Sequence, residues 1–455
     1  MSSLIGVLLT ALFYSLVGWP LTYMLGKISK IERSGIAFLL SNGLSTFVWF
    51  LLYRVVGRFN LFTLLLSGLF ILAVSCLINH TFGFKYKNLI DPKLTGFDLK
   101  LSHLVIALLL TSFLIGSYNP ISGWDAITLY DFRGHTIALN HSLKDLTDDS
   151  SYMGYPLMIS LDHAAVYMLK GISAQGLHSI ILMAFIAVVY GRMCKWTNPR
   201  LSLLTILFII LNEEIFAHST VSYVNLAYLV YLVTGLIYII TPVRESKELG
   251  FLFAGGLLIG LTTWIRSDVP FWMIGIILIL IQGWQLRAKA LSLFSVYIVY
   301  LMRHTWFHFF IDIQVSSREL NESLSSPTTM NVLKQVSNYL PDTETIKQIQ
   351  SILPEIIRYL YLNIFSPFRG LWLLTIPIFV IVFKRRDFRL VLLLLAILLS
   401  AMMATFGVML FSTSYSTWNL IGGSAKRMML FIIPLAIITS IYALHLTGTG
   451  KNETK

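Results

Sequence analysis

The chain has 455 residues, of which 56% are hydrophobic and 12% are charged, and its formal net charge is +12. A soluble domain carries about 25% charged residues, so this composition excludes a soluble globular protein. The basic excess does not indicate nucleic-acid binding, because it is spread over short loops between apolar runs.

Apolar runs of about 20 residues recur along the chain and predict an all-α, polytopic membrane protein with about 13 transmembrane helices. The predicted spans lie near 4–26, 35–56, 60–80, 101–118, 175–191, 201–217, 222–241, 250–264, 270–286, 290–310, 366–383, 390–411 and 428–447. The first run has no small-residue cleavage site, so we interpret it as a retained span. Cys76 and Cys194 lie in or next to spans and predict no disulfide framework.

Alternate loops between these spans differ in charge. One set, which includes the run Lys384-Arg385-Arg386 and the C-terminal tail, holds 20 Lys/Arg and 7 Asp/Glu, whereas the rest of the chain holds 14 and 15. Cytoplasmic loops carry the excess of Lys and Arg, so the pattern predicts a cytoplasmic C-terminus and an N-terminus on the outside. We therefore expect an integral membrane protein, of a prokaryotic cell membrane, with an extracytoplasmic active site.

Four regions are expected within a single membrane domain. N-terminal helices occupy 1–100, and a catalytic transmembrane region occupies 101–310 with a first outer loop at 119–174. A second large outer loop covers 311–365, and C-terminal helices with the cytoplasmic tail cover 366–455. Apolar residues recur at helical spacing in both outer loops, which favours helices that lie in the membrane interface; a small lumenal cap is the alternative for the second loop.

Ionisable residues gather at the predicted outer ends of the spans. They are Asp125, Asp131, Arg133, Glu213, Glu214, Arg266, Asp268, Arg303, His304, Arg369, Lys426 and Arg427. An acid or base beside fixed positive charge is what a reaction on an anionic, lipid-linked substrate requires. Ordinary alternatives are a solvated helix end for Glu213 and Glu214, an ion pair between Arg266 and Asp268, and a helix N-cap for Asp125.

Several stretches share their order with a known family. Gly-Trp-Asp-Ala at 123–126, Tyr130-Asp131-Phe132-Arg133 and Tyr155-Pro156-Leu157 together resemble the first outer loop of GT-C type glycosyltransferases. These polytopic enzymes include protein O-mannosyltransferases and aminoarabinose transferases. The stretches 219–226, 262–268 and 427–434 are similar to three further motifs of the same family. Two departures are Asn225, where the family has an acidic residue, and Val269, where it has glycine.

This resemblance implies a GT-C-like fold and a transferase that moves a sugar from a polyprenyl-phosphate donor to an acceptor hydroxyl on a glycan, lipid or protein. Asp125 would be the general base. The lipid phosphate would be held by Arg266, Arg369 and Arg427. The remaining residues of the implied substrate site are Trp124, Tyr130, Asp131, Tyr155, Asn225 and Asp268.

No metal site is predicted, although a divalent ion (Mg²⁺ or Mn²⁺) remains compatible with the resemblance. Three histidines share the first outer loop, but no His-x-x-x-His or paired-cysteine pattern appears. Besides the donor and acceptor, the expected partners are membrane lipids.

Two other classes of function share the predicted topology. A transporter or flippase for lipid-linked sugars would place its ionisable groups near the bilayer midplane, whereas the predicted mid-span positions here are nearly all apolar. A glycan polymerase or ligase would use the same kind of donor and transfer whole oligosaccharides.

Overall fold

The computed structural model describes residues 2–89, 94–144, 146, 156–241, 249–266, 271–282, 286–310, 343, 347, 350–351, 353–365, 377–378, 380–381, 387–414 and 427–449. Regular structure in these residues is almost entirely helical, so the predicted all-α class is confirmed. Contacts within the chain divide it into two compact units, Met1–Glu322 and Ser323–Lys455, which are described separately below.

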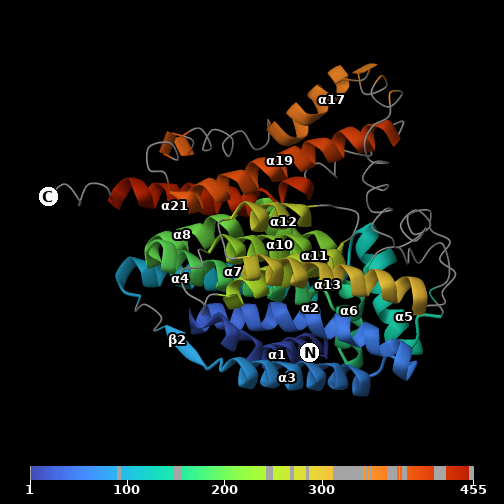
Figure 1. The fold of residues 1–455 in the computed structure, drawn as a ribbon. Helices are drawn as coiled ribbons and strands as arrows, with labels where there is room; N and C mark the ends of the chain where they lie inside the picture. The colour runs from blue at the N-terminus through green and yellow to red at the C-terminus, as the bar shows by residue number, and fades with distance from the viewer. Residues whose placement is uncertain are drawn as a thin grey trace. The chain divides into compact units, whose positions relative to one another are not determined.

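The first unit is a helical bundle (Figure 1). In chain order its helices are α1 (Ser2–Gly18), η1 (Pro20–Leu25), α2 (Lys30–Val56), α3 (Leu61–Phe82), α4 (Gly96–Tyr118), η2 (Ala126–Asp131), α5 (Phe132–Asn140), α6 (Met158–Met168), α7 (Gly176–Trp196), α8 (Pro199–Ile210), α9 (Glu213–Ser219), α10 (Val224–Ile240), α11 (Leu249–Ile265), α12 (Trp272–Ile281) and α13 (Leu286–Phe310). Two short strands, β1 (Lys27–Ser29) and β2 (Lys87–Leu89), pair in parallel.

The long apolar helices indicate an integral, multi-pass membrane protein, but with fewer spans than predicted. Among the described residues six helices are long and apolar enough to cross a bilayer, or seven if α8 and α9 count as one span bent by 73°. The predicted number of about 13 is therefore not supported. Several predicted spans form helices of 10–17 residues, which reach about 15–25 Å and fall short of the roughly 30 Å hydrocarbon core.

Burial separates the central helices of the first unit from the peripheral ones. All 17 residues of α10 are buried, and so are 78% of the residues in the apolar 18-residue stretches of α2 and α7. By contrast, only 33% and 28% of the residues in the corresponding stretches of α3 and α4 are buried. A helix that is apolar on every side belongs in a protein core or in lipid. We infer that α10 is enclosed by protein, whereas α3 and α4 expose apolar faces suited to acyl chains.

Local sequence signals fix the ends of these helices. Ser29 caps α2 by accepting a hydrogen bond from the backbone N–H of Glu32 at 3.0 Å, and Gly57, with φ of 73°, ends the helix in the left-handed region. Asn60 and Thr63 form a capping box at the start of α3. The polar caps thus stand between apolar runs and set where each helix begins.

Small residues let the central helices approach closely. A Cβ on Gly255 of α11 would lie 3.0 Å from the carbonyl oxygen of Gly235 in α10, and one on Gly256 would lie 2.4 Å or less from α13 atoms around Ser292 and Ser295. In lipid the hydrophobic effect does not drive helices together, so helices there associate through close backbone packing at small residues. Alanine at Gly256 would therefore force α11 and α13 apart.

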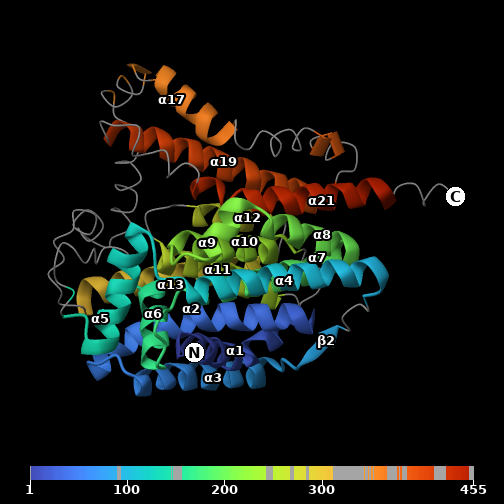
Figure 2. The same ribbon diagram turned by 180° about the vertical axis from the view of Figure 1, so that it is seen from behind.

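The helices run between two ends of the first unit. One end carries η2, α5 and α6 and is called the Asp131 end; the other carries β1, β2 and the start of α2 and is called the Glu32 end (Figures 1 and 2). Helix α2 runs from the Glu32 end to the Asp131 end, because the hydroxyl of Tyr53, near its C-terminus, contacts Ser142 near the Asp131 end. In the predicted orientation, the Asp131 end is the outer one.

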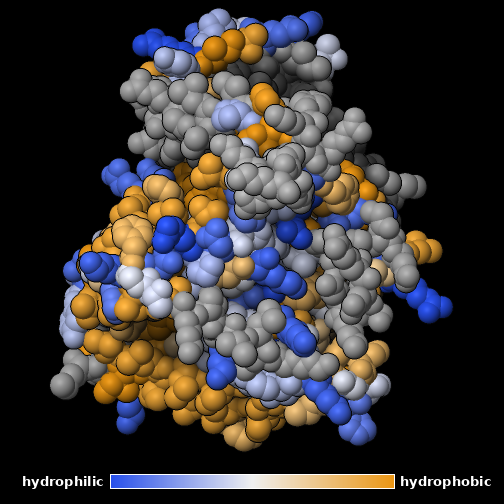
Figure 3. All heavy atoms as spheres, turned by 90° about the vertical axis from the view of Figure 1, so that its left-hand side faces the viewer, coloured by the Kyte–Doolittle hydropathy of each residue, from blue (hydrophilic) through white to orange (hydrophobic). Residues whose placement is uncertain are grey.

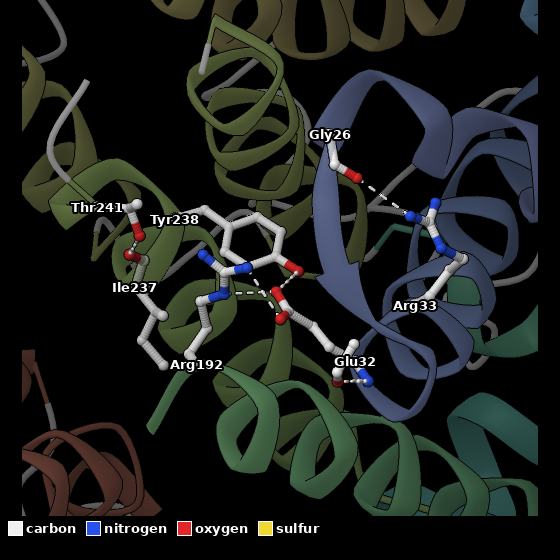
Figure 4. Close-up of polar contacts among 8 residues, drawn as sticks. Gly26, Glu32, Arg33, Arg192, Ile237, Tyr238 and Thr241 are labelled. Atoms are coloured by element: carbon white, nitrogen blue, oxygen red, sulfur yellow. Dashed lines mark hydrogen bonds and ion pairs between the residues drawn. The ribbon is translucent and has the colours of Figure 1, made fainter. Parts of the chain in front are cut away.

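A buried ion pair joins three helices at the Glu32 end. Arg192 of α7 donates to both carboxylate oxygens of Glu32 in α2, at 2.5 and 2.9 Å, and the Tyr238 hydroxyl of α10 donates to the same carboxylate at 3.1 Å (Figure 4). Both charged side chains are 1% exposed. Gly191 allows this approach, because a Cβ there would lie 2.5 Å from the Glu32 Cβ. In the predicted topology both residues fall in loops of the basic set, at 27–34 and 192–200, and no pairing between them is predicted.

The second unit contains α17 (Leu353–Leu360), η5 (Tyr361–Phe365), α19 (Phe388–Ser414) and α21 (Ile433–Thr449) among its described residues. Parts of α19 and the segment Arg427–Gly448 are two of the six candidate spans. In α17 the side chain of Ile357 is 58% exposed, whereas Tyr359 and Leu360 are 8% exposed. This short helix falls within the predicted amphipathic stretch of the second outer loop. Most of the remaining stretch, and most of the predicted span at 366–383, lie outside the described residues.

Candidate functional site at the Asp131 end

Asp125 sits on a helical turn that follows α4. Gly123 has φ of 93°, a backbone conformation that other residues rarely adopt, so glycine allows the chain to turn sharply here. Trp124 is 75% exposed, whereas Asp125 is half-buried. Asp125 has helical backbone angles and its side chain does not cap η2. The N-cap alternative for Asp125 is therefore not supported.

The turn packs against the segment that opens α10. A Cβ on Gly123 would collide with the hydroxyl of Tyr223, so the backbone at Gly123 lies directly against that side chain. Tyr223 is the residue before α10, and Asn225 lies in the first turn of that helix. The structure thus brings together two of the stretches on which the family resemblance depends, although about 100 residues separate them in the sequence.

A third stretch joins them through Arg266. This residue follows the last residue of α11, and its Nη1 donates a hydrogen bond to the side-chain oxygen of Asn225 at 2.7 Å. Asn225 is 2% exposed, so its amide is held firmly in place. Asn225 is neutral, so it accepts this bond without bringing a negative charge to the site.

Asp131 is held by partners from α6. Its carboxylate lies 3.1 Å from Nδ1 of His163 and accepts a hydrogen bond from the Tyr167 hydroxyl. Burial acts to raise the pKa of Asp131, but the contacts with His163 and Tyr167 outweigh it and hold the pKa below its ordinary value. Burial and the adjacent carboxylate raise the pKa of Tyr167. Because both contacts hold the Asp131 carboxylate, we expect Asp131 to fix the turn and not to orient a sugar hydroxyl.

Tyr130, which the resemblance placed in the substrate site, is only 4% exposed. The guanidinium carbon of Arg133 lies 5.8 Å from the centre of its ring, and Arg133 itself is buried and donates from Nε to the carbonyl oxygen of Leu129 at 3.0 Å. The structure therefore places Tyr130 and Arg133 inside the protein, where they support the turn that carries Asp125.

Replacing Asp131 by asparagine is expected to lower the free energy of unfolding at pH 7 by about 1–3 kcal/mol, because hydrogen bonds to an ionised acceptor are lost. The carboxyl's folded pKa lies below the unfolded value of 3.8, so its stabilisation is present above pH 3.8 and is lost as pH falls through the folded pKa. Thermal unfolding from pH 2 to 7 should thus show a smaller acid-induced loss for Asp131→Asn than for the wild type. An identical pH dependence of the two would contradict this role; Asp98→Asn, at the Glu32 end, is the matched control.

A second buried network, which sequence analysis missed, anchors α6. Oδ1 of Asp162 accepts from the Tyr14 hydroxyl at 2.9 Å and from the Asn42 side-chain nitrogen at 2.6 Å, and Asn42 accepts from the Tyr231 hydroxyl at 2.8 Å. These residues link α1, α2, α6 and α10. The only signal in the sequence is a polar residue within each of several apolar stretches. Because α6 also carries His163 and Tyr167, the network positions the partners of Asp131.

The remaining predicted site residues are not brought to this end by the described structure. Tyr155, Asp268 and Arg369 lie outside the described residues. Arg427 belongs to the second unit, and the site of the first unit is described without it. Within the described ranges, no group of three His, Cys, Asp or Glu side chains is arranged to hold a metal ion.

Comparison with known proteins identifies no relative of this chain. No family model matches it, and neither a curated protein nor a solved structure does. The functional argument therefore depends on the residues and on the geometry of the Asp131 end.

Proposed function

We propose that this protein transfers a sugar from a polyprenyl-phosphate donor to an acceptor hydroxyl at the Asp131 end of the first unit. The observation that carries the proposal is the meeting of the Asp125 turn, the Tyr223–Asn225 segment and Arg266 at this end. A carboxylate and a guanidinium group at the same end of the unit would provide a base for the acceptor and a counter-charge for the phosphate.

The reaction is a displacement at the anomeric carbon of the sugar. Asp125 takes the proton from the acceptor hydroxyl while its oxygen forms the new glycosidic bond. The bond between the anomeric carbon and the phosphate oxygen breaks, and its electron pair stays on the departing polyprenyl phosphate. Arg266 stabilises the charge that grows on that phosphate. Trp124, which is 75% exposed, offers an aromatic face to the sugar.

Arg266→Gln is expected to raise the KM for the lipid-linked donor at least tenfold, because hydrogen bonds to a charged partner contribute about 1.5–3 kcal/mol. The measurement is consumption of defined polyprenyl-phosphate sugars by the purified protein in lipid nanodiscs. Arg54→Gln removes an exposed arginine from the last turn of α2 and is the matched control. An unchanged donor KM in a folded Arg266→Gln protein would count against the phosphate role.

A transporter or flippase for lipid-linked sugars is the second candidate, and the Asp162 network favours it. Asp162, Asn42 and Tyr231 form a polar group that is buried among α2, α6 and α10. Ionisable groups buried between the helices of a membrane protein often mark transport pathways. The two candidates differ in their product, because a transferase releases polyprenyl phosphate whereas a flippase leaves the donor intact.

A further inference from the structure

The parallel strand pair at the Glu32 end brings lysines together. In the register of this pair, Lys27 of β1 lies beside Lys87 of β2, and Ile28 lies beside Asn88. The side chain of Lys27 is exposed, whereas Ile28 is completely buried. The exposed Lys27 side chain therefore places its positive charge on the surface at this end.

Further positive charge and aromatic rings surround the strand pair. Lys30 and Lys85 are exposed. The ring of Tyr86 lies 5.6 Å from that of Tyr23, and the guanidinium carbon of Arg33 lies 4.8 Å from the centre of the Tyr86 ring. The nearest carboxylate in sequence, Glu32, points away towards Arg192, in the opposite direction from Arg33 (Figure 4). That carboxylate is therefore already engaged and does not neutralise the lysines.

The same patch borders a surface suited to lipid tails. Leu77 and Phe82 on the last part of α3 are 66% and 67% exposed, and the exposed Lys85 follows within three residues of Phe82. This change from apolar to basic side chains, with Tyr86 at the boundary, is typical of the level of lipid headgroups. Viewed onto this end, hydrophilic residues gather near the centre and hydrophobic residues cover the flanks (Figure 3).

We propose that the patch formed by Lys27, Lys30 and Lys85 binds the phosphate headgroup of an anionic phospholipid, whose acyl chains lie along α3. The lysines supply the counter-charge, and the exposed apolar face of α3 supplies a contact that free phosphate cannot use. The bound lipid belongs to the leaflet at the Glu32 end, which is the cytoplasmic leaflet in the predicted orientation. This site lies at the opposite end from Asp125 and does not depend on the proposed transfer reaction.

The test uses the full chain, purified in nanodiscs of phosphatidylcholine with or without phosphatidylglycerol. Native mass spectrometry counts retained phosphatidylglycerol, and thermal unfolding reports stability. Each lysine near an anionic surface contributes roughly fivefold to binding, so Lys27→Gln/Lys85→Gln should weaken retention about thirtyfold. Arg58→Gln/Lys144→Gln removes the same charge from exposed positions nearer the Asp131 end and should retain the lipid as the wild type does.

Three results would overturn the proposal. The first is equal retention of phosphatidylglycerol by the two double variants when both unfold at the wild-type temperature in phosphatidylcholine. The second is equal loss by both, which would show a response to net charge alone. The third is stabilisation by millimolar inorganic phosphate in pure phosphatidylcholine that matches the effect of phosphatidylglycerol, which would assign the patch to a free anion.

Discussion

Asp125→Asn is expected to reduce sugar transfer by about 100- to 10,000-fold while leaving the fold intact. A general base contributes an acceleration of this size, and asparagine preserves the shape of the side chain while removing its ability to accept a proton. Asp125 is half-buried on a helical turn, and thermal unfolding of the variant shows whether the fold is retained. The measurement is the rate of donor consumption at saturating donor and acceptor.

The matched control for this variant is Asp98→Asn, which removes a carboxylate from the Glu32 end, where Asp98 pairs with the exposed Arg200. That protein should retain the wild-type rate. If Asp125→Asn unfolds at the wild-type temperature and keeps more than a tenth of the rate, Asp125 is not the base, and the assignment of the reaction to this turn is wrong.

Glu32→Ala is expected to lower the free energy of unfolding by about 3–5 kcal/mol. Removing one member of a buried ion pair leaves the other charge without compensation in a medium that solvates it poorly. The Arg192 guanidinium would remain buried among α2, α7 and α10, where Glu32 now accepts two of its hydrogen bonds. Chemical or thermal unfolding in detergent, followed by circular dichroism, measures the change.

Two further variants test whether the large loss of stability comes from the burial of the Glu32–Arg192 pair. Asp98→Ala breaks the pair with Arg200, which is 61% exposed, and exposed pairs contribute about 0.2–1 kcal/mol. Glu32→Met combined with Arg192→Met removes both charges and should be less destabilising than Glu32→Ala alone, because no charge is left buried. Similar losses for Glu32→Ala and Asp98→Ala would contradict the role assigned to the buried pair.

The helical class could be predicted from the sequence because it depends on local patterns. Long apolar runs indicate helices in lipid, whereas the order of the stretches around Asp125, Asn225 and Arg266 only assigns them to the same predicted membrane face. The contact between Arg266 and Asn225 and the packing of Gly123 on Tyr223 come from the structure. The proposed chemistry there remains a prediction.

The partners of individual charges could not be predicted, because they come from distant parts of the chain. His163 and Tyr167 bind Asp131 from 32 and 36 residues away, and Arg192 reaches Glu32 across 160 residues. Each of these residues, taken alone, has the appearance of an ordinary loop or helix-end residue. The predicted number of spans depends on average hydropathy, which does not show how long each helix is or where a helix bends, as between α8 and α9.

The central claim is that the Asp131 end breaks the bond between a sugar and a polyprenyl phosphate. The most direct measurement incubates the wild-type protein in proteoliposomes with defined polyprenyl-phosphate sugars and an acceptor mixture, and analyses the lipids by mass spectrometry. The account predicts free polyprenyl phosphate in amounts equal to the glycosylated acceptor, and none with Asp125→Asn. Recovery of the intact donor from the opposite leaflet, without any free polyprenyl phosphate, would contradict it and assign the protein to lipid transport.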